Sequence, residues 1–263
     1  MLSAEGASST YGAKPQSFPM ENSYRTRIYN PCLAGRQKEL AILPQEELTI
    51  RLPFLKKLVR QHFPREIDAS ILDLGCGRGV LIRVARQMGY RNVRGIDGSP
   101  EQVAAAKALG IDDIQCADAM EALCKERDSS FDCVVCFDLL EHFSKDELIL
   151  LVDAIHRVLK PTGRWIIHTP NAESPFGMKV RYGDLTHELA FTRMSLSQLF
   201  LSSGFSRVSC YEDEPVPHGI KSAGRLLLWK CFRSLLRLYI AAETGNTNGE
   251  AIFSQNILAV VIK

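Results

Sequence analysis

The chain has 263 residues, of which 46% are hydrophobic and 24% charged, with 18 Gly and 12 Pro. These proportions are typical of a folded protein with a buried core, so a collagen, a wholly disordered chain and a disulfide-held miniprotein are excluded. The formal net charge is +2, so no overall field favours nucleic acid as a partner. No run approaches the roughly 20 apolar residues of a membrane span, and the first 22 residues hold no apolar signal core, which favours a cytoplasmic protein with reduced cysteines.

The first part of the chain differs in pattern from the rest. Residues 1–30 are rich in Ser, Gly, Pro and Asn and show no periodicity, which predicts a flexible arm. Apolar residues then recur at helical spacing, so residues 31–66 are predicted to form a helical lead-in with Pro44 and Pro53 at helix starts or breaks. Residues 67–263 are predicted to form the main domain.

In this main domain, short apolar runs alternate with helical stretches. The expected strands are Ser70–Leu74, Asn92–Ile96, Asp113–Cys116, Phe131–Phe137 and Arg164–Thr169. The expected helices between them are Gly79–Met88, Ser99–Leu109, Ala119–Lys125 and Lys145–Leu159. Towards the C-terminus, strands are expected at Phe205–Tyr211 and Asn256–Ile262, with a long helix at Gly219–Glu243 between them. This alternation predicts an α/β fold, a doubly wound and mainly parallel sheet covered by helices on both faces.

The strongest motif is ILDLGCGRG, in which a buried strand runs into Gly75, Gly77 and Gly79 and a helix follows. Glycine there lets the backbone turn tightly and approach a ligand, and the helix N-terminus offers free N–H groups. The spacing is G-x-G-x-G, whereas dinucleotide-binding loops have G-x-G-x-x-G. Asp73 precedes the first glycine by two residues and would repel a pyrophosphate. The motif therefore predicts a nucleotide-like ligand that carries positive charge.

Acidic residues also end the next two strands. Asp97 follows Gly75 by 22 residues, where an α/β sheet places a carboxylate that accepts hydrogen bonds from a ribose. Asp118 and Ala119 follow the third strand. Because the carboxyl ends of parallel strands share one edge, Asp73, Asp97 and Asp118 are expected to face one crevice. For each aspartate alone, a helix cap or a loop hydrogen bond is the alternative.

Taken in order, DLGCGRG, GID, ADA, FDCVVCFDLLEH and LKPTGR resemble the motifs of class I S-adenosylmethionine (SAM)-dependent methyltransferases. The resemblance implies a Rossmann-like sheet of seven strands with an antiparallel C-terminal strand, and SAM as the cofactor. It also implies that the Asp73 end of the loop holds the methionine part, Asp97 the ribose, and Asp118 with Ala119 the adenine. The implied cofactor-binding residues are Asp73, Gly75, Cys76, Gly77, Asp97, Gly98, Asp118, Ala119 and Phe137.

Residues 171–194 are similar to the acceptor lid of methyltransferases that act on glycans, lipid-linked sugars and quinones, with the core DLTHELAFT. Methyl transfer needs an oriented acceptor oxygen, and a hydroxyl acceptor also benefits from a general base. His187 is the leading candidate base, because imidazole is suited to proton transfer near neutral pH, and Asp184 is expected to orient it. His142, which follows the fourth strand, is the competing candidate. A structural hydrogen bond within the lid is the alternative role for His187.

Asp138, Glu141 and His142 also resemble the E-x-x-E-H pattern of ubiquinone-type O-methyltransferases, which implies a divalent metal site. The first acid is Asp in this chain where that family has Glu, which shortens its reach. A resident metal is therefore not our main expectation.

Helix Gly219–Glu243 is predicted to be amphipathic. Lys221, Arg225, Arg233 and Arg237 recur at a spacing of four or its multiple, and Trp, Phe and Leu fill much of the remaining surface. Such a helix suits a peripheral membrane contact. Packing on the enzyme core, or a dimer contact, is the alternative.

We expect an enzyme, a SAM-dependent O-methyltransferase acting on a hydroxyl of a glycan, a lipid-linked sugar or a related small molecule. The alternatives are a quinone or phenol O-methyltransferase of the ubiquinone type and a non-catalytic SAM-binding partner subunit. A dehydrogenase is disfavoured by the glycine spacing. A nucleic-acid methyltransferase is disfavoured because FDLL replaces the D/N-P-P-Y/F motif of base methylation. No nucleic-acid partner is expected, and the chain is expected to be a monomer or a homodimer.

Overall fold

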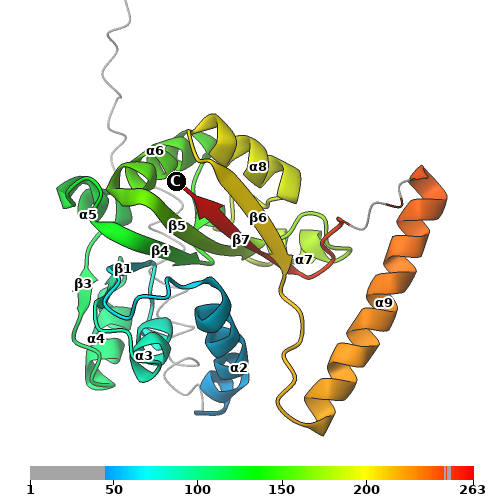
Figure 1. Cartoon of the computed structure of the whole chain (residues 1–263), viewed down its shortest axis with the longest axis horizontal. Helices are drawn as coiled ribbons and strands as arrows, with labels where there is room; N and C mark the ends of the chain where they lie inside the picture. Colours follow the sequence, from blue (N-terminus) through cyan, green and yellow to red (C-terminus); the bar gives the residue numbers. More distant parts are fainter. Residues whose placement is uncertain (1–44, 246, 248–249) are drawn as a thin grey trace, which may run out of the picture. The chain divides into compact units, whose positions relative to one another are not determined.

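The computed structural model describes residues 45–263 except 246, 248 and 249. The predicted arm and the first part of the predicted lead-in, residues 31–44, therefore lie outside the described residues. Seven strands form one sheet in the order β3-β2-β1-β4-β5-β7-β6 (Figure 1). The strands are β1 (Ile71–Leu74), β2 (Val93–Asp97), β3 (Ile114–Cys116), β4 (Phe131–Phe137), β5 (Leu159–Pro170), β6 (Arg207–Glu212) and β7 (Asn256–Ile262).

The sheet is parallel except at β7, which pairs antiparallel with both β5 and β6. This confirms the predicted doubly wound sheet with an antiparallel C-terminal strand. The helices are α2 (Gln45–His62), α3 (Val80–Gln87), α4 (Pro100–Ala108), α5 (Ala119–Lys125), the 3-10 turn η2 (Leu140–His142), α6 (Lys145–Val158), α7 (Gly177–Gly183), α8 (Arg193–Ser202) and α9 (Ile220–Thr244).

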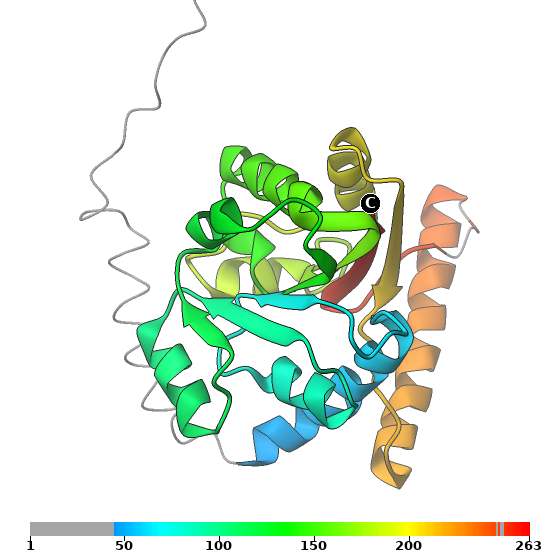
Figure 2. The ribbon, with the colours of Figure 1, turned by 60° about the vertical axis from the view of Figure 1, so that its left-hand side comes forward.

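Helices cover both faces of the sheet because both faces carry apolar side chains (Figure 2). On one face, α5, α6 and α8 bury residues such as Leu123, Leu151 and Phe200 beside Trp165 of β5. On the other face, α2, α3 and α4 bury residues such as Leu58 and Ile82. The two apolar clusters fix the sheet, and they leave the loops at the carboxyl ends of the strands to form the site.

Short sequence signals start several of these helices. Ser99 caps α4 by accepting a hydrogen bond from the Gln102 N–H, and Pro100 follows it at the first helical position. Ser144 and Glu147 form a reciprocal capping box at the start of α6. These local sequence signals therefore fix where α4 and α6 begin and where the loops before them end.

Two details differ from expectation. Helix α2 runs through Pro53 without a break. Proline removes one helical hydrogen bond, but Leu55, Leu58 and Val59 on the next turns are buried, and this burial favours the continuous helix. Strand β5 begins at Leu159 rather than Arg164, and the residues between the expected helix and strand form a bulge inside it, where Thr162 has a φ of 64°. In the described part of the chain, no helix is long and apolar enough to cross a membrane.

Candidate active site at the carboxyl ends of the strands

The glycine loop after β1 adopts a conformation that favours glycine. Gly75, Gly77 and Gly79 all have positive φ angles, of 77°, 53° and 70°. At Gly79 an added Cβ would lie 2.7 Å from Cδ1 of Ile114, so this glycine allows close packing of helix α3 on the sheet. At Gly77 an added Cβ would meet nothing within 4 Å. The loop is thus packed on one side and open at Gly77, where a ligand can approach the backbone.

Asp97 ties this loop to the end of β2. Its carboxylate accepts hydrogen bonds from the Gly77 N–H at 2.7 Å and from the Ser99 N–H at 2.9 Å. Cys76 lies between the strands, and its Sγ would be only 2.5 Å from a Cβ added at Gly95. The thiol of Cys76 therefore packs against Gly95 of β2, while the residue is partly exposed, and its contact with a cofactor stays a prediction. Gly98 continues the same turn after Asp97.

Asp73 is buried at the end of β1, with 3% of its surface exposed. Burial, and then the neighbouring charge of Asp97, raise the pKa of this carboxyl to about 7. Among the described residues, no hydrogen-bond donor or cation pairs with it. A buried acid of this kind is stabilised by a cationic ligand group. The ammonium group of SAM carries that charge, so the residues present fit the cofactor implied by the sequence.

Asp118 already has partners in the protein. Its Oδ1 accepts hydrogen bonds from the Met120 N–H at 2.9 Å and the Glu121 N–H at 3.1 Å, so it caps helix α5. Ala119 is the first residue of that helix. Both residues follow β3 on the same edge of the sheet as Asp73 and Asp97, and their contact with adenine stays a prediction.

An ionic cluster that sequence reasoning did not single out lies at the ends of β4 and β5. Nδ1 of His168 lies 2.7 Å from Oδ1 of Asp138, and its Nε2 lies 3.4 Å from Oδ2 of Asp213. The ring of His168 stacks on Phe137 at a centroid distance of 5.0 Å. The available signal was a single histidine in an otherwise apolar strand, which the β4–β5 register places beside Phe137.

His168 and Asp138 stabilise each other's charged forms, as in an ion pair. Burial alone would lower the pKa of His168, but the charge and hydrogen bond of Asp138, with Asp213 behind them, raise it to about 9. Burial alone would raise the pKa of Asp138, but His168, and then the more distant Arg51, bring it below its usual value. We conclude that His168 is protonated at neutral pH and that Asp138 is ionised.

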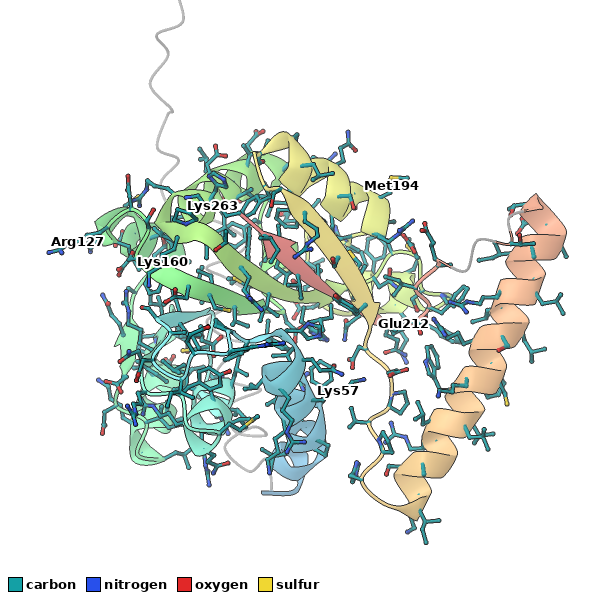
Figure 3. The ribbon with its side chains drawn as sticks, in the orientation of Figure 1. Lys57, Arg127, Lys160, Met194, Glu212 and Lys263 are labelled. Atoms are coloured by element: carbon teal, nitrogen blue, oxygen red, sulfur yellow. The ribbon has the colours of Figure 1, made fainter. Side chains whose placement is uncertain are left out.

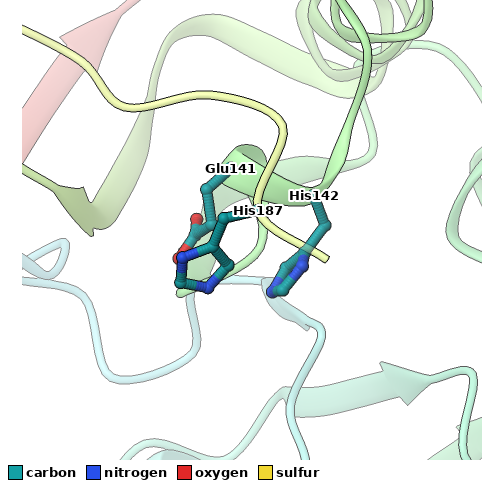
Figure 4. Close-up of side chains that lie close together, drawn as sticks. All are labelled: Glu141, His142 and His187. Carbon is teal, nitrogen blue, oxygen red and sulfur yellow. The ribbon is translucent and has the colours of Figure 1, made fainter. Parts of the chain in front are cut away.

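The acceptor side brings together Glu141, His142 and His187, as Figure 4 shows. One possible ligand atom from each lies within 4.8 Å of the others. The two imidazole rings meet edge to face at a centroid distance of 4.8 Å. Glu141 is buried and accepts a hydrogen bond from the Thr169 hydroxyl at 3.1 Å. Burial, and then the charge of Asp138, raise the pKa of Glu141 to about 8.

Hydrogen bonds fix the orientation of the two histidines. Nδ1 of His187 lies 3.1 Å from the carbonyl oxygen of Val180, so Nδ1 carries the proton and Nε2 is left as the basic atom. Oδ1 of Asp184 accepts hydrogen bonds from the N–H and the hydroxyl of Thr186, at 2.9 and 2.7 Å. The Thr186 hydroxyl in turn lies 3.0 Å from Nδ1 of His142. Asp184 therefore acts on His142 through Thr186, whereas the Val180 carbonyl orients His187.

The lid is anchored to η2 at its base. The N–H groups of Glu188 and Leu189 both donate to the carbonyl oxygen of Glu141, at 2.7 and 3.1 Å. These bonds hold residues 186–189 against the end of β4. His187 of the lid therefore lies beside Glu141 and His142 of η2. A separate cavity of about 700 Å³ is lined by Lys57, Tyr211, Arg233 and others, and none of the predicted site residues borders it. We therefore assign the site to the strand ends and not to that cavity.

Comparison with known proteins agrees with this geometry. Residues 45–209 match a family model described as a methyltransferase domain. Two curated relatives are named ubiquinone biosynthesis O-methyltransferase. That of Xylella fastidiosa is 33% identical over 132 residues, which cover 49% of this chain and 52% of the relative. That of Xanthomonas oryzae is 36% identical over 107 residues, which cover 39% and 44%. The matched region thus spans about half the length of these relatives.

Solved structures share the fold at low identity. A SAM-dependent methyltransferase from Archaeoglobus fulgidus has a TM-score of 0.61 at 19% identity, covering 83% of this chain and 98% of its own. A putative methyltransferase of Haloferax volcanii, solved with its Trm112 activator, also has a TM-score of 0.61, at 18% identity, covering 91% and 97%. The family match spans most of the sheet and the whole glycine loop. The chain belongs to the methyltransferase-domain family, among the class I SAM-dependent methyltransferases.

Proposed function

We propose that the protein is an O-methyltransferase whose acceptor is a phenolic hydroxyl of the quinone-precursor class. The observation that carries this proposal is the position of His187, with a free Nε2, beside Glu141 and His142 at the carboxyl end of β4. The relatives named for ubiquinone biosynthesis favour a quinone-type acceptor over the glycan or lipid-linked sugar of our first expectation.

Bound SAM supplies an electrophilic methyl group on a sulfonium. The acceptor oxygen forms a bond to the methyl carbon while the carbon–sulfur bond breaks, and that electron pair stays on sulfur, which leaves S-adenosylhomocysteine. Nε2 of His187 accepts the hydroxyl proton, and its Nδ1–H remains bonded to the Val180 carbonyl. Asp73 and Asp97 hold the cofactor, and the lid orients the acceptor and excludes water.

The test uses purified protein, radiolabelled SAM, and two soluble acceptors offered separately. Protocatechuate represents the phenolic class, and methyl glucoside represents the sugar class. We expect label in protocatechuate only, with a strong loss in the His187→Gln variant. Label in the sugar alone would reverse the choice of acceptor. Measured SAM binding with no transfer to either acceptor would favour the non-catalytic partner subunit.

A metal-assisted form of the same reaction is the second candidate, because Glu141, His142 and His187 form a set of two imidazoles and one carboxylate. Such a set suits a borderline divalent ion such as Zn²⁺ or Mn²⁺, which would bind and polarise the acceptor hydroxyl. Asp138, the acid suggested by the sequence motif, is instead paired with His168. If a metal binds here, His187 replaces Asp138 as the third ligand.

Metal binding can be measured without turnover. We expect Mn²⁺ or Zn²⁺ to raise the melting temperature of chelator-treated protein by binding to Glu141, His142 and His187. Glu141→Gln should remove that rise. An unchanged melting temperature, with full activity in chelator, would leave His187 as the base and exclude the metal-assisted form.

A further inference from the structure

Helix α9 has an inner and an outer face with different surroundings. On the inner face, Ser222 is buried, and Nε of Arg233 lies 2.6 Å from Oε2 of Glu212. Figure 3 shows Glu212 at the end of β6. The outer face carries large apolar side chains, each at least 60% exposed. They are Ile220, Leu227, Leu228, Phe232, Leu235, Leu238 and Tyr239. We call these seven residues the outer face of α9.

The outer face is continuous along the helix. At 3.6 residues per turn, its members fall within an arc of about 140° over the whole length of the helix. Single exposed leucines are ordinary, whereas a continuous exposed apolar strip of this kind marks an interaction surface. Figure 1 shows α9 beside the sheet as a long rod with no other described element on its outward side.

The charges on α9 indicate what covers this strip. The helix has five basic residues and one acid, Glu243, although the whole chain has a net charge of only +2. Lys221 and Arg225 lie along one edge of the outer face and Lys230 lies beyond the other, and all three are exposed. An apolar strip between basic edges is complementary to an anionic lipid surface, where the bases meet phosphates and the strip meets acyl chains.

The same charges disfavour a second copy as the partner. A symmetric dimer through the outer face would bring two strongly basic helices together with one acidic residue each, so like charges would face each other. The helix is also too polar to cross a bilayer, and no described helix meets the criteria for a span. A helix that lies in the plane of the membrane surface can place its apolar strip among the acyl chains and its basic edges beside the lipid phosphates.

We propose that α9 docks the protein on anionic membrane surfaces, with its outer face inserted at the level of the lipid headgroups. This inference is independent of the acceptor assigned above. It also divides the basic residues predicted from sequence into two groups. Arg233 faces Glu212 and holds the helix to β6, whereas Lys221, Arg225 and Lys230 are free to meet lipid.

The experiment is co-sedimentation of the full chain with large vesicles of phosphatidylcholine, with or without phosphatidylglycerol. We expect binding only when phosphatidylglycerol is present. The triple variant Lys221→Gln, Arg225→Gln, Lys230→Gln should bind roughly a hundredfold more weakly, because each basic residue contributes about a fivefold gain near an anionic surface. Phe232→Glu with Leu235→Glu should abolish binding.

Matched controls separate this role from folding. Leu150→Glu alters an apolar residue of α6 that is also 60% exposed, and it should leave vesicle binding unchanged. All variants should keep wild-type affinity for SAM, which reports an intact domain. Wild-type protein that stays in solution with phosphatidylglycerol vesicles would overturn the proposal. If, in addition, it self-associates in sedimentation velocity and Phe232→Glu stops this, the outer face is a dimer contact instead.

Discussion

The two ends of the candidate site differ in whether the protein itself supplies a cation beside its acidic residues. At the ends of β1 and β2, Asp73 and Asp97 lie close together, and burial and mutual repulsion raise the pKa of Asp73 to about 7. At the ends of β4 and β5, Asp138 lies 2.7 Å from His168, and the pKa of Asp138 is lowered. The Asp73 end, at β1 and β2, lacks a cation among the described residues. The Asp138 end, at β4 and β5, has His168 as its own cation.

This difference indicates which end is built for a ligand. A buried acid without a cation is stabilised when a positively charged molecule binds beside it. Asp138 is only partly buried and already has a protonated histidine beside it, so it gains little from a second cation and serves to fix the structure. We expect SAM to supply the charge that completes the Asp73 end, whereas the ion pair at the Asp138 end supports Phe137, on which His168 stacks.

The largest effect is expected where chemistry depends on a single side chain. His187→Ala should lower kcat by about 10²- to 10⁴-fold, the usual contribution of a general base. The affinity for SAM should not change, because His187 lies in the lid and not at the glycine loop. Rapid-quench kinetics and calorimetry measure the two quantities separately.

His187→Gln distinguishes a base from a lid support. Its amide N–H can still donate to the Val180 carbonyl, but the side chain cannot accept a proton. Recovery of wild-type kcat in this variant would show that His187 only fixes the lid.

At the other end, Asp97→Ala should weaken SAM binding by about 10- to 100-fold. The change removes the carboxylate that we expect to accept a hydrogen bond from the ribose, and one such bond to a charged group contributes about 1.5–3 kcal/mol. Asp97→Asn keeps an acceptor oxygen and should lie between Ala and wild type in calorimetry. An unchanged affinity in Asp97→Ala would disprove the assignment of this end to SAM.

The Asp73 end could be predicted from sequence because its signals are local. The strand, the three glycines and the acids at the ends of β1, β2 and β3 all lie within 50 residues, and a parallel sheet brings such ends to one edge. The helices between them also begin within one residue of their predicted starts. The seven strands were also expected from local patterns, whereas the reversal at β7 came from the family resemblance, because local patterns do not specify the order or direction of strands in a sheet.

The Asp138 end could not be predicted because its contacts join distant residues. His168 reaches Asp213 across 45 residues, and His142 reaches Thr186 across 44. No spacing rule connects such pairs, since each depends on the register of β5 and on the path of the lid. The orientation of Arg233 depends in the same way on Glu212 of β6. Sequence spacing alone grouped Arg233 with the basic residues expected to meet a membrane, whereas in the structure it pairs with Glu212.

The pH dependence of SAM binding tests the Asp73 end directly. Asp73 must be ionised to pair with the ligand's ammonium group, and its pKa in the free protein is about 7. Affinity should therefore fall by about tenfold per pH unit below that value and level off above it. Asp73→Asn should bind more weakly and with a flat profile over this range. Equal slopes in the two proteins would assign the titration to another group.

The smallest expected effect concerns stability at the Asp138 end, and its pH dependence has the opposite sign. The pKa of His168 in the folded protein is about 9, whereas the ordinary pKa of histidine is 6.5. Its contribution is therefore complete below pH 6.5 and is lost as the pH rises through 9. His168→Gln should lower the free energy of unfolding by about 1–2 kcal/mol at pH 6, since Asp138 is partly exposed and its charge is screened. Urea melts at pH 6 and pH 10 measure this, and the gap between wild type and variant should narrow at the higher pH. A gap of equal size at both values would mean that His168 contributes by packing on Phe137 rather than by its charge.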